Sequence, residues 1–376
     1  MAGSWQAIDW NGLPVRAWVP EPTDRLLDAV TSRAQRRAAR ASEALQRQSD
    51  ELPVGWEPLA RLLLRTEGVA SSQIEEVRAP LPDVAAAELD PHLASQAAGW
   101  VADNLNAVTQ AIERVRPPLT LAVLHRWHRT LMRSADYLPA ATVGAFRRQL
   151  GWIAGASPRI AAHVATPPDL VPAAMRDLLG FINRQDIEPT VQAAIAHAQF
   201  ELIHPYADGN GRLGRILVSW VLVRRLGLRV PPPISVLLAR DRPSYVGSLT
   251  GFREIGPTHW VEYFADTADE AARATGDLLE SVGAVLADWE EQVSDLRSMA
   301  AGRQVVRLLA AHPVVSAEVA AAEVGVSTRA ARTALDQLHD RGILAPYRPE
   351  RRRRGRPSNL WVATRLLDVL ATWGVA

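Results

Sequence analysis

The segment from His204 to Arg215 concentrates residue types that can bind phosphate and move a proton. Gly209, Asn210 and Gly211 permit positive φ angles and close backbone approach, so their N–H groups can form a nest for an anion. Apolar residues recur at helical spacing on both sides of the segment. The N-terminus of the second helix would add a dipole that favours an anion. This pattern predicts a phosphate-binding turn between two helices.

Charged side chains around the turn indicate what chemistry a bound phosphate would meet. Arg212 and Arg215 are three residues apart, so they share one side of the first helical turn. Cations oppose the dipole at a helix N-terminus unless a polyphosphate lies there, and arginine suits phosphate oxygens. Asp208 can hold a magnesium ion that bridges phosphates, and His204 can accept the proton of an attacking hydroxyl. A turn without a ligand is the alternative, which the density of polar and glycine positions disfavours.

The composition excludes several classes of nucleotide-handling protein. All 42 basic residues are arginine, so the lysine of a Walker A loop, a protein kinase or a Schiff-base enzyme is missing. Cysteine is absent, which removes disulfides and thiolate chemistry. The formal net charge of +1 gives no indication of a partner. Acidic residues among the first thirty and the lack of a long apolar run predict a cytoplasmic protein without a membrane segment.

The hydrophobic periodicity predicts a mostly α protein of 376 residues. A small hairpin at 149–164, which we call the flap, is the single strand candidate in the first 300 residues. We expect four parts: an N-terminal helical region (1–110), a helical core (111–268), a connecting helix (269–300) and a winged helix-turn-helix (301–376). Helices are expected at 24–49, 57–79, 94–114, 119–133, 169–185, 190–204, 211–226, 242–252 and 260–299.

The segment that begins at His204 resembles the signature of the Fic family, His-Pro-Phe-x-Asp/Glu-Gly-Asn-Gly-Arg-x-x-Arg. Tyr206 in place of the phenylalanine is the one difference, and it keeps an aromatic ring under the loop. Leu124-His125, the flap and the residues before the motif also resemble the family, so the likeness covers roughly residues 50 to 265. The resemblance implies a Fic-type helical bundle core and a protein adenylyltransferase. Such an enzyme moves AMP from ATP to a Tyr, Ser or Thr hydroxyl of a target protein or of itself.

The resemblance also implies a role for each position of the motif. His204 would be the general base, and Asp208 would ligate Mg²⁺. Arg212 would contact the β-phosphate, and Arg215 the γ-phosphate. The ATP-binding set would comprise Gly209, Asn210, Gly211, Arg212, Leu213, Gly214, Arg215 and, near the adenine, Tyr245. For Tyr245 a place in the core is an equal alternative.

A second resemblance concerns regulation. Ser71 and Glu75 are four residues apart in a helical stretch and share one face. They resemble the family's inhibitory motif, Ser/Thr-x-x-x-Glu-Gly/Asn, in its N-terminal placement. The resemblance implies that Glu75 pairs with Arg215 and so competes with the γ-phosphate. Glu76 departs from the motif's Gly or Asn, and a solvated helical face is the alternative.

Two further segments are candidates for contact with macromolecules. In the flap, residues 159–164 resemble the edge strand to which the family's targets add their backbone; an ordinary packed hairpin is the alternative. In the winged helix-turn-helix, Arg329 and Arg332 are expected to face outward on a recognition helix that follows the N-cap Ser327. The basic run 351–356 would form the wing tip, which suits DNA phosphates. Dimerisation or target docking is the alternative for this module.

Several histidines are expected to be structural rather than to bind metal. His125 and His128 are three apart but lack a third ligand at helical spacing, and His197 is expected in the core. The sequence is also compatible with two other functions. One is a DNA-binding regulator with a nucleotide-sensing core, and the other is an enzyme that removes AMP with water positioned by Glu75. Homodimer formation is also left open.

Overall fold

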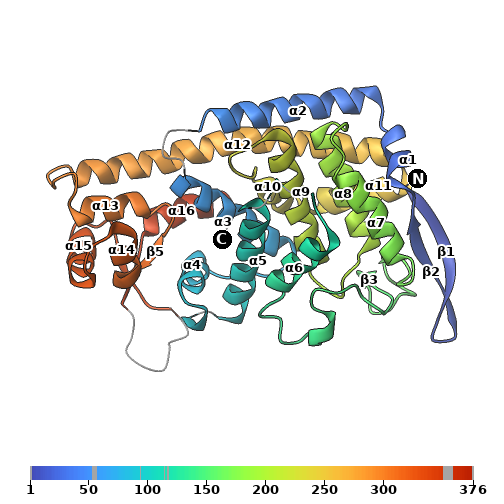
Figure 1. The fold of residues 1–376 in the computed structure, drawn as a ribbon, viewed down its shortest axis with the longest axis horizontal. Helices are drawn as coiled ribbons and strands as arrows, with labels where there is room; N and C mark the ends of the chain where they lie inside the picture. Colours follow the sequence, from blue (N-terminus) through green and yellow to red (C-terminus); the bar gives the residue numbers. More distant parts are fainter. Residues whose placement is uncertain are drawn as a thin grey trace.

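The computed structural model describes residues 2–52, 57–93, 95–113, 115–116, 118–349 and 359–374. Helices dominate these ranges, as the periodicity predicted, and three small antiparallel sheets accompany them (Figure 1). None of the helices in these ranges combines the length and the apolar character needed to cross a membrane.

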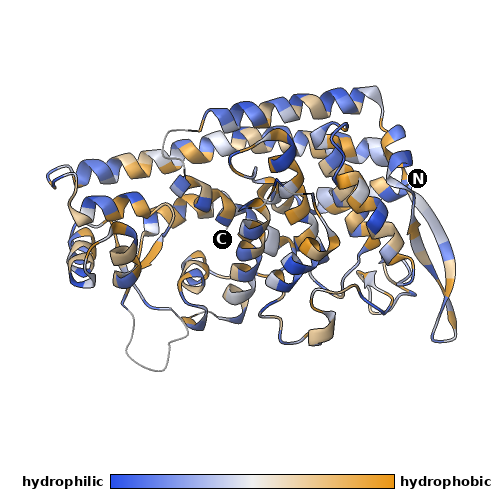
Figure 2. Cartoon of the chain, viewed as in Figure 1, coloured by the Kyte–Doolittle hydropathy of each residue, from blue (hydrophilic) through white to orange (hydrophobic). Residues whose placement is uncertain are grey.

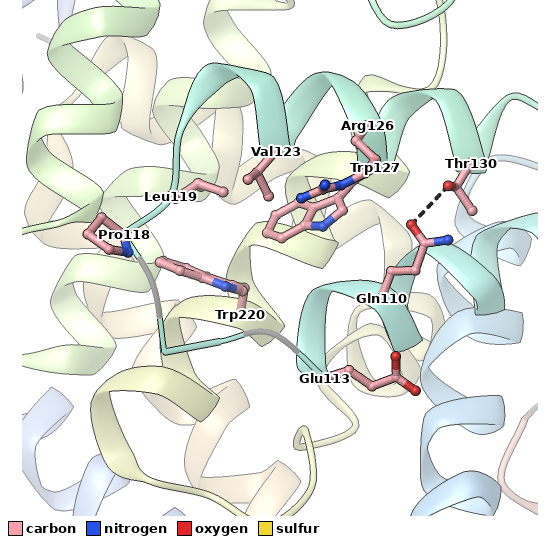
Figure 3. Close-up of a pocket in the computed structure, with 9 residues that line it drawn as sticks. All are labelled: Gln110, Glu113, Pro118, Leu119, Val123, Arg126, Trp127, Thr130 and Trp220. Carbon is pink, nitrogen blue, oxygen red and sulfur yellow. Dashed lines mark hydrogen bonds between the residues drawn. The ribbon is translucent and has the colours of Figure 1, made fainter.

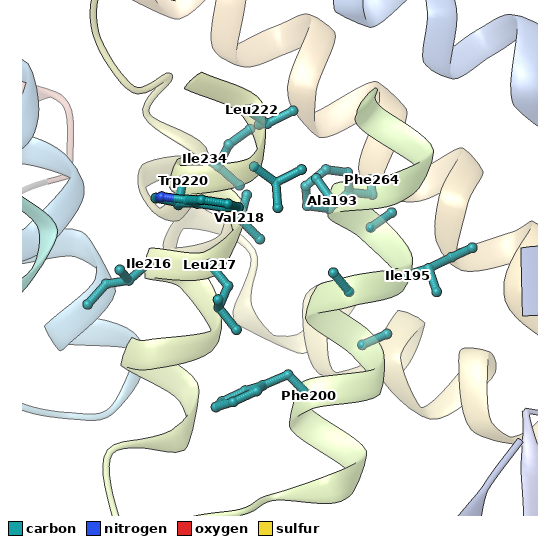
Figure 4. Close-up of a cluster of buried hydrophobic side chains, with 14 of the residues drawn as sticks. Ala193, Ile195, Phe200, Ile216, Leu217, Val218, Trp220, Leu222, Ile234 and Phe264 are labelled. Atoms are coloured by element: carbon teal, nitrogen blue, oxygen red, sulfur yellow. The ribbon is translucent and has the colours of Figure 1, made fainter. Parts of the chain in front are cut away.

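Two antiparallel neighbours, α8 (Pro189–Ile203) and α9 (Asn210–Leu226), form the centre of the larger core. Both helices are buried on nearly every side, which is why their sequences are apolar all round instead of amphipathic. Phe200 of α8 reaches toward α9, and Trp220 of α9 belongs to the same cluster of buried side chains (Figure 4). The phosphate-binding turn predicted from the sequence is the connection between these two buried helices.

A long helix, α12 (Pro257–Gln292), crosses the molecule, and α2 (Ser32–Asp50) packs along it (Figure 1). Small residues at helical spacing on α2, Ala34, Ala38 and Ala41, are buried in this contact. The outer face of α2 is largely hydrophilic (Figure 2). A stripe of alanines therefore positions α2 closely against α12.

The other helices of the N-terminal and central parts surround this centre. Their bounds are α1 (Thr23–Asp28), α3 (Glu57–Ile74), α4 (Leu81–Leu89), η1 (Pro91–Leu93), α5 (Gln96–Glu113), α6 (Leu121–Leu131), η2 (Ala140–Thr142), α7 (Val171–Ile182), α10 (Ile234–Arg240) and α11 (Arg242–Glu254). The helix predicted at 24–49 is divided into α1 and α2, and the one predicted at 57–79 ends at Ile74. Helices α4 and α10 were not predicted.

Residues 3–20 form a β-hairpin, so the prediction of a helical region over 1–110 was wrong for this part. Strands β1 (Gly3–Trp10) and β2 (Leu13–Pro20) pair in register from Gly3↔Pro20 to Trp10↔Leu13. Asn11 and Gly12, with φ of 54° and 80°, make the turn. An Asn-Gly pair favours a two-residue turn of this kind, so the sequence did contain the signal.

The flap is a hairpin as predicted, with two short strands, β3 (Trp152–Ile153) and β4 (His163–Val164). Most of the segment between them is irregular, since strand pairing is limited to two residue pairs. Ile160 lies in this segment and is 70% exposed. The flap therefore presents an apolar side chain to solvent.

The C-terminal part contains helices and a three-stranded sheet in the order β5-β7-β6. Its elements are α13 (Ala301–Leu308), β5 (Val314–Ser316), α14 (Ala317–Val324), α15 (Thr328–Asp340), β6 (Ala345–Tyr347), β7 (Leu360–Val362) and α16 (Thr364–Thr372). Ser327 caps α15 by accepting from the Ala330 N–H over 3.2 Å, as predicted. Arg329 and Arg332 are exposed on α15, and the basic run 351–356 lies outside the described residues.

Candidate active site

The loop between α8 and α9 is held in an unusual conformation by its own residues. His204 ends α8 with a left-handed backbone, φ 50° and ψ 61°, and Gly209 precedes α9 with φ 75°. The side chain of Asn210 accepts from the Tyr206 N–H and donates to the Tyr206 carbonyl, both over 2.9 Å. Because its side chain braces the loop, Asn210 can contribute only its backbone N–H to an anion site.

Arg147 fastens the same loop from outside, and sequence analysis missed it. Its Nε donates to the His204 carbonyl over 2.7 Å, and an Nη donates to the Ile203 carbonyl over 3.2 Å. Further hydrogen bonds reach the carbonyls of Gln149 and Thr166 in and beside the flap. One buried guanidinium thereby joins the flap to the loop between α8 and α9. No local pattern around Arg147 indicated this role.

Aromatic and imidazole rings pack beneath the loop. The ring of Tyr206 is fully buried and stacks on His128, with centroids 4.0 Å apart. His128 Nδ1 accepts from the Gly144 N–H over 2.8 Å, so its Nε2–H donates to the Asp208 carbonyl over 3.0 Å. The Tyr206 hydroxyl, which the family's phenylalanine lacks, hydrogen-bonds His125 Nδ1 over 2.9 Å. Both histidines are thus structural.

His204 and Asp208 stand at the two ends of the loop. Burial lowers the pKa of His204 to about 4, and the charge of Arg147 adds to this effect. The imidazole is therefore neutral at neutral pH and can accept a proton. The carboxylate of Asp208 accepts from the Tyr137 hydroxyl over 2.5 Å and from the Gly209 N–H over 2.5 Å. These two donors fix the carboxylate beside the start of α9.

The first turn of α9 has unused hydrogen-bonding capacity. A Cβ at Gly209 would stand 2.8 Å from Met132 Sδ, so only glycine fits this left-handed position. Arg212 is 5% exposed, and its Nε is buried without a hydrogen-bond partner among the described residues. A buried donor without a partner is costly unless a ligand supplies an acceptor.

Glu75 takes the place of an anion in this structure. Its Oε1 accepts from Arg215 Nη2 over 2.9 Å, and a Cβ at Gly211 would stand only 2.0 Å from the same oxygen. Burial opposes the charge of Glu75, but Arg215, Arg212 and His204 outweigh it and lower its pKa. The carboxylate consequently lies over the first turn of α9, as the resemblance implied for its pairing with Arg215.

Ser71 completes the surroundings of Arg215. Its hydroxyl accepts from Arg215 Nε over 2.9 Å, and its carbonyl accepts from Arg215 Nη2 over 2.8 Å. The side chain of Arg215 is 2% exposed, whereas that of Glu75 is 39% exposed. The guanidinium is therefore held inside the protein, and the carboxylate is the partner that can move away.

Helix α3 ends immediately before Glu75, at Ile74. Glu76 adopts a left-handed conformation with φ 62°, and the Val77 N–H returns to the Ser72 carbonyl over 3.0 Å. Left-handed positions favour Gly and Asn, which explains why the motif that this segment resembles has Gly or Asn there. Glu76 keeps the same backbone geometry, and its side chain pairs with Arg242 over 2.9 Å.

A pocket of about 320 Å³ opens beside these groups, with Glu75, His204 and Arg215 in its lining. The buried Tyr245 also lines it, and its hydroxyl hydrogen-bonds His197 Nε2 over 2.8 Å. His197 is therefore in the core, as expected. Tyr245 and His204 thus line one pocket, and the size of this pocket suits a small ligand.

Two predicted positions, Leu213 and Gly214, are not in the lining of this pocket. Leu213 is fully buried in the core, and a Cβ at Gly214 would stand 2.4 Å from Glu201 Oε1. These residues therefore set the close packing of α9 on α8 and leave contact with a ligand to their neighbours. Burial raises the pKa of Glu201 to about 8, so this second carboxyl group in the pocket is mostly protonated at neutral pH.

Another hollow, of about 430 Å³, lies between α5, α6 and α9 (Figure 3). Trp127 and Trp220 line it, and Thr130 donates to Gln110 at its rim over 3.0 Å. None of the predicted site residues lines this hollow.

The fold and the site define a helical protein with a pocket of about 320 Å³, a glycine-rich turn at the start of α9 and a histidine with a lowered pKa. Residues 118–222 match the Fic/DOC family. A probable protein adenylyltransferase of Aquifex aeolicus is 37% identical over 84 residues, which are 22% of this chain and 24% of that protein. The protein adenylyltransferase fic-1 of Caenorhabditis elegans is 26% identical over 181 residues, 45% of this chain and 32% of its own length. The chain thus matches about a third or less of these relatives.

Solved structures share the fold. A Fic family protein from Desulfovibrio desulfuricans G20 has a TM-score of 0.55 at 23% identity, over 89% of this chain and 97% of its own. Fic-1 from C. elegans (residues 134–508) has a TM-score of 0.53 at 19% identity, over 66% of this chain and 74% of its own. The comparisons identify a Fic/DOC domain at residues 118–222 and protein adenylyltransferases among the homologues.

Proposed function

We propose that this chain is a protein adenylyltransferase that Glu75 holds inactive. The observation that carries the proposal is the position of the Glu75 carboxylate, over Gly211 and against Arg215. An anion already lies where the turn, the helix dipole and the arginines favour phosphate. The protein adenylyltransferases among the homologues support AMP transfer as the reaction.

In the proposed reaction a hydroxyl oxygen of the target attacks the α-phosphorus of ATP. The new P–O bond forms as the bond to the β-phosphate breaks, and pyrophosphate leaves. The hydroxyl proton passes to His204, whose neutral imidazole is available because burial keeps its pKa near 4. His204 also borders a hollow of about 620 Å³ on the flap side, lined by Phe146 and Trp152 among others, through which an acceptor can approach.

The phosphates would be bound by backbone and guanidinium groups. The N–H groups of Asn210 and Gly211 open α9, whereas that of Gly209 donates to the Asp208 carboxylate in this structure. Arg212 offers a buried Nε with no partner among the described residues. Arg215 would bind the γ-phosphate once Glu75 leaves. Tyr245 stands in the pocket wall as a candidate for contact with the adenine.

The site also fits Mg²⁺. The described residues contain no cluster of three His, Cys, Asp or Glu side chains that could hold a metal, so Asp208 would be its one protein carboxylate. One carboxylate together with substrate phosphates is a usual way for proteins to bind Mg²⁺. The bound ion would neutralise phosphate charge, and Asp208 would hold it beside the turn.

Label transfer tests the proposal. The Glu75→Gly variant should incorporate label from α-labelled ATP into itself or into lysate proteins at least about tenfold faster than wild type, because Arg215 becomes free for the γ-phosphate. Mass spectrometry of the labelled proteins would identify the modified side chain. Addition of His204→Ala to this variant should abolish the label.

The controls separate inhibition from general loosening. Glu76→Gly removes the adjacent carboxylate, which contacts Arg242 and not Arg215, so it should leave transfer at the wild-type rate. Equal labelling by wild type and Glu75→Gly would refute inhibition by Glu75. Labelling that survives His204→Ala would refute its role as base. Loss of AMP from a pre-modified target that requires Glu75 would favour AMP removal instead.

We further infer that the C-terminal part is a winged helix-turn-helix that contacts DNA. The exposed Arg329 and Arg332 on α15 favour this second function, as does the strand order β5-β7-β6 beside the helix pair α14 and α15. Duplex DNA should bind at low salt and dissociate as salt rises, and Arg332→Glu should weaken binding. No binding at low salt would leave dimerisation or target docking for this part.

A further inference from the structure

The N-terminal hairpin β1–β2 lies beside the flap, although the two are far apart in the sequence. The ring of Trp5 on β1 is 6.2 Å from that of His163 on β4, and Trp10 is 6.1 Å from Trp152 on β3, edge to face. Figure 1 shows the hairpin projecting at the edge of the molecule next to the flap region. Two ring contacts therefore join the hairpin to both strands of the flap.

A groove of about 510 Å³ runs between the two hairpins. Trp5, Ala7 and Pro14 line it from the N-terminal hairpin. Pro158 and Ala161 line it from the flap. The lining side chains other than two arginines are apolar, and polar and apolar groups share the exposed surface about equally.

The charged side chains in the lining are both arginines. Arg16 on β2 is exposed and lies over the ring of Trp5 at 5.7 Å, and Arg159 on the flap is exposed. Neither makes an ion pair within the described ranges. Nearby carboxylates have other partners: Glu254 pairs with Arg253, and Asp9 accepts from the Gly12 N–H in the hairpin turn. The groove therefore offers two free cations, one on each wall.

Ala162 lines both the groove and the pocket of the active site, and apolar side chains are exposed on the same two hairpins. Ile160 is 70% exposed, Leu13 is 41% exposed and Ile153 is 38% exposed. Ile153 also lines the pocket that contains His204 and Arg215. Exposed apolar side chains flanked by arginines are typical of a surface that binds protein.

We propose that this groove docks an extended, acidic segment of the target protein, and so selects targets with carboxylates near the acceptor hydroxyl. The inference rests on the proposed function, because the protein has a target only if it transfers AMP to another protein. It goes beyond that function because it assigns a recognition surface to the N-terminal hairpin. The segment would place apolar side chains on Trp5 and Pro14 and carboxylates against Arg16 and Arg159, which steers its approach and fixes its direction.

Peptide binding to the full chain without ATP tests this proposal. The probe is a short fluorescein-labelled peptide in which Glu alternates with Val. The control is a peptide of the same length and label in which Lys replaces Glu. Fluorescence anisotropy should show binding of the acidic peptide and at least about tenfold weaker binding of the basic one. Arg16→Glu and Arg159→Glu should each weaken acidic-peptide binding at least about fivefold, and the double variant should prefer the basic peptide.

Arg40→Glu, an exposed arginine on α2, makes the same charge change away from the groove and should leave peptide binding unchanged. The proposal is overturned if the wild type binds both peptides equally or neither. It is also overturned if Arg40→Glu matches the effect of Arg16→Glu, or if single-stranded DNA displaces the acidic peptide at moderate salt. Because no nucleotide is present, a failed label transfer by Glu75→Gly would refute AMP transfer and leave the groove result standing.

Discussion

Oε1 of Glu75 accepts a hydrogen bond from Nη2 of Arg215 over 2.9 Å, although 140 residues separate them. The pair is asymmetric: the arginine is buried and the carboxylate is exposed. Two contacts to Ser71 keep the guanidinium in place when Glu75 leaves. Both contacts are neutral, so the buried cation then lacks a counter-charge until another anion binds. An inhibitory contact with a fixed cation and a movable anion suits release by a competing phosphate.

The contact of Ser71 with Arg215 predicts a graded release. Ser71→Ala removes the acceptor of Arg215 Nε and leaves the backbone carbonyl, so the guanidinium should be held less firmly. We expect label transfer between that of wild type and that of Glu75→Gly. Ser72→Ala is the matched control, because this buried hydroxyl donates to the Gly68 carbonyl and has no bond to Arg215. Equal rates for the two serine variants would contradict the prediction.

Glu76→Gly should stabilise the fold. The left-handed backbone at φ 62° costs a non-glycine residue about 1–2 kcal/mol. The exposed ion pair with Arg242 that would be lost contributes about 0–1 kcal/mol. We expect a net gain of about 1 kcal/mol in the free energy of unfolding, measured by urea denaturation. Arg242→Ala isolates the ion pair, and a less stable Glu76→Gly protein would show that the pair outweighs the strain.

Tyr206→Phe restores the residue of the Fic signature and removes the bond to His125. The loss of this hydrogen bond should lower the free energy of unfolding by about 0.5–1.5 kcal/mol. The ring and its stacking on His128 remain, so label transfer in the Glu75→Gly background should persist. In a His125→Ala background the same change should cost less, since the partner is already missing. Additive losses would contradict a direct bond.

The dependence of stability on pH should pass through a maximum. Burial lowers the pKa of four histidines below 6.5: His128, His163 and His204 to about 4 and His197 to about 3. Between about pH 4 and about pH 6.5 the unfolded chain therefore binds more protons at these sites than the folded one. The free energy of unfolding should rise with pH across this window.

Two buried carboxyl groups act in the opposite direction. Burial raises the pKa of Glu67 from 4.5 to about 7 and that of Glu201 to about 8. The folded state binds more protons there, so their contribution falls as pH rises. Above about pH 6.5 the histidines no longer oppose them, and stability should decline toward about pH 8. Urea denaturation across this range measures the curve, and Glu201→Gln should flatten the decline; a steady rise to pH 8 would contradict it.

The sequence by itself determined the chemistry of the turn. Its glycines, arginines, aspartate and histidine are local in the chain, and the flanking helices follow from apolar periodicity, so their positions could be predicted closely. The Ser327 cap and the outward placement of Arg332 followed from local rules in the same way. The Asn11-Gly12 turn is local as well, so the N-terminal hairpin could also have been predicted from the sequence.

Tertiary structure alone decided which distant groups complete the site. Arg147 joins carbonyls of the flap and of the loop, and its sequence neighbours give no sign of those partners. The protonation states of His204 and Glu201 depend on burial, which arises from packing between helices. The nearness of Trp5 to His163 likewise depends on how the hairpin docks. Local spacing fixes residues on one element, whereas contacts between elements are set by the packing of the whole core.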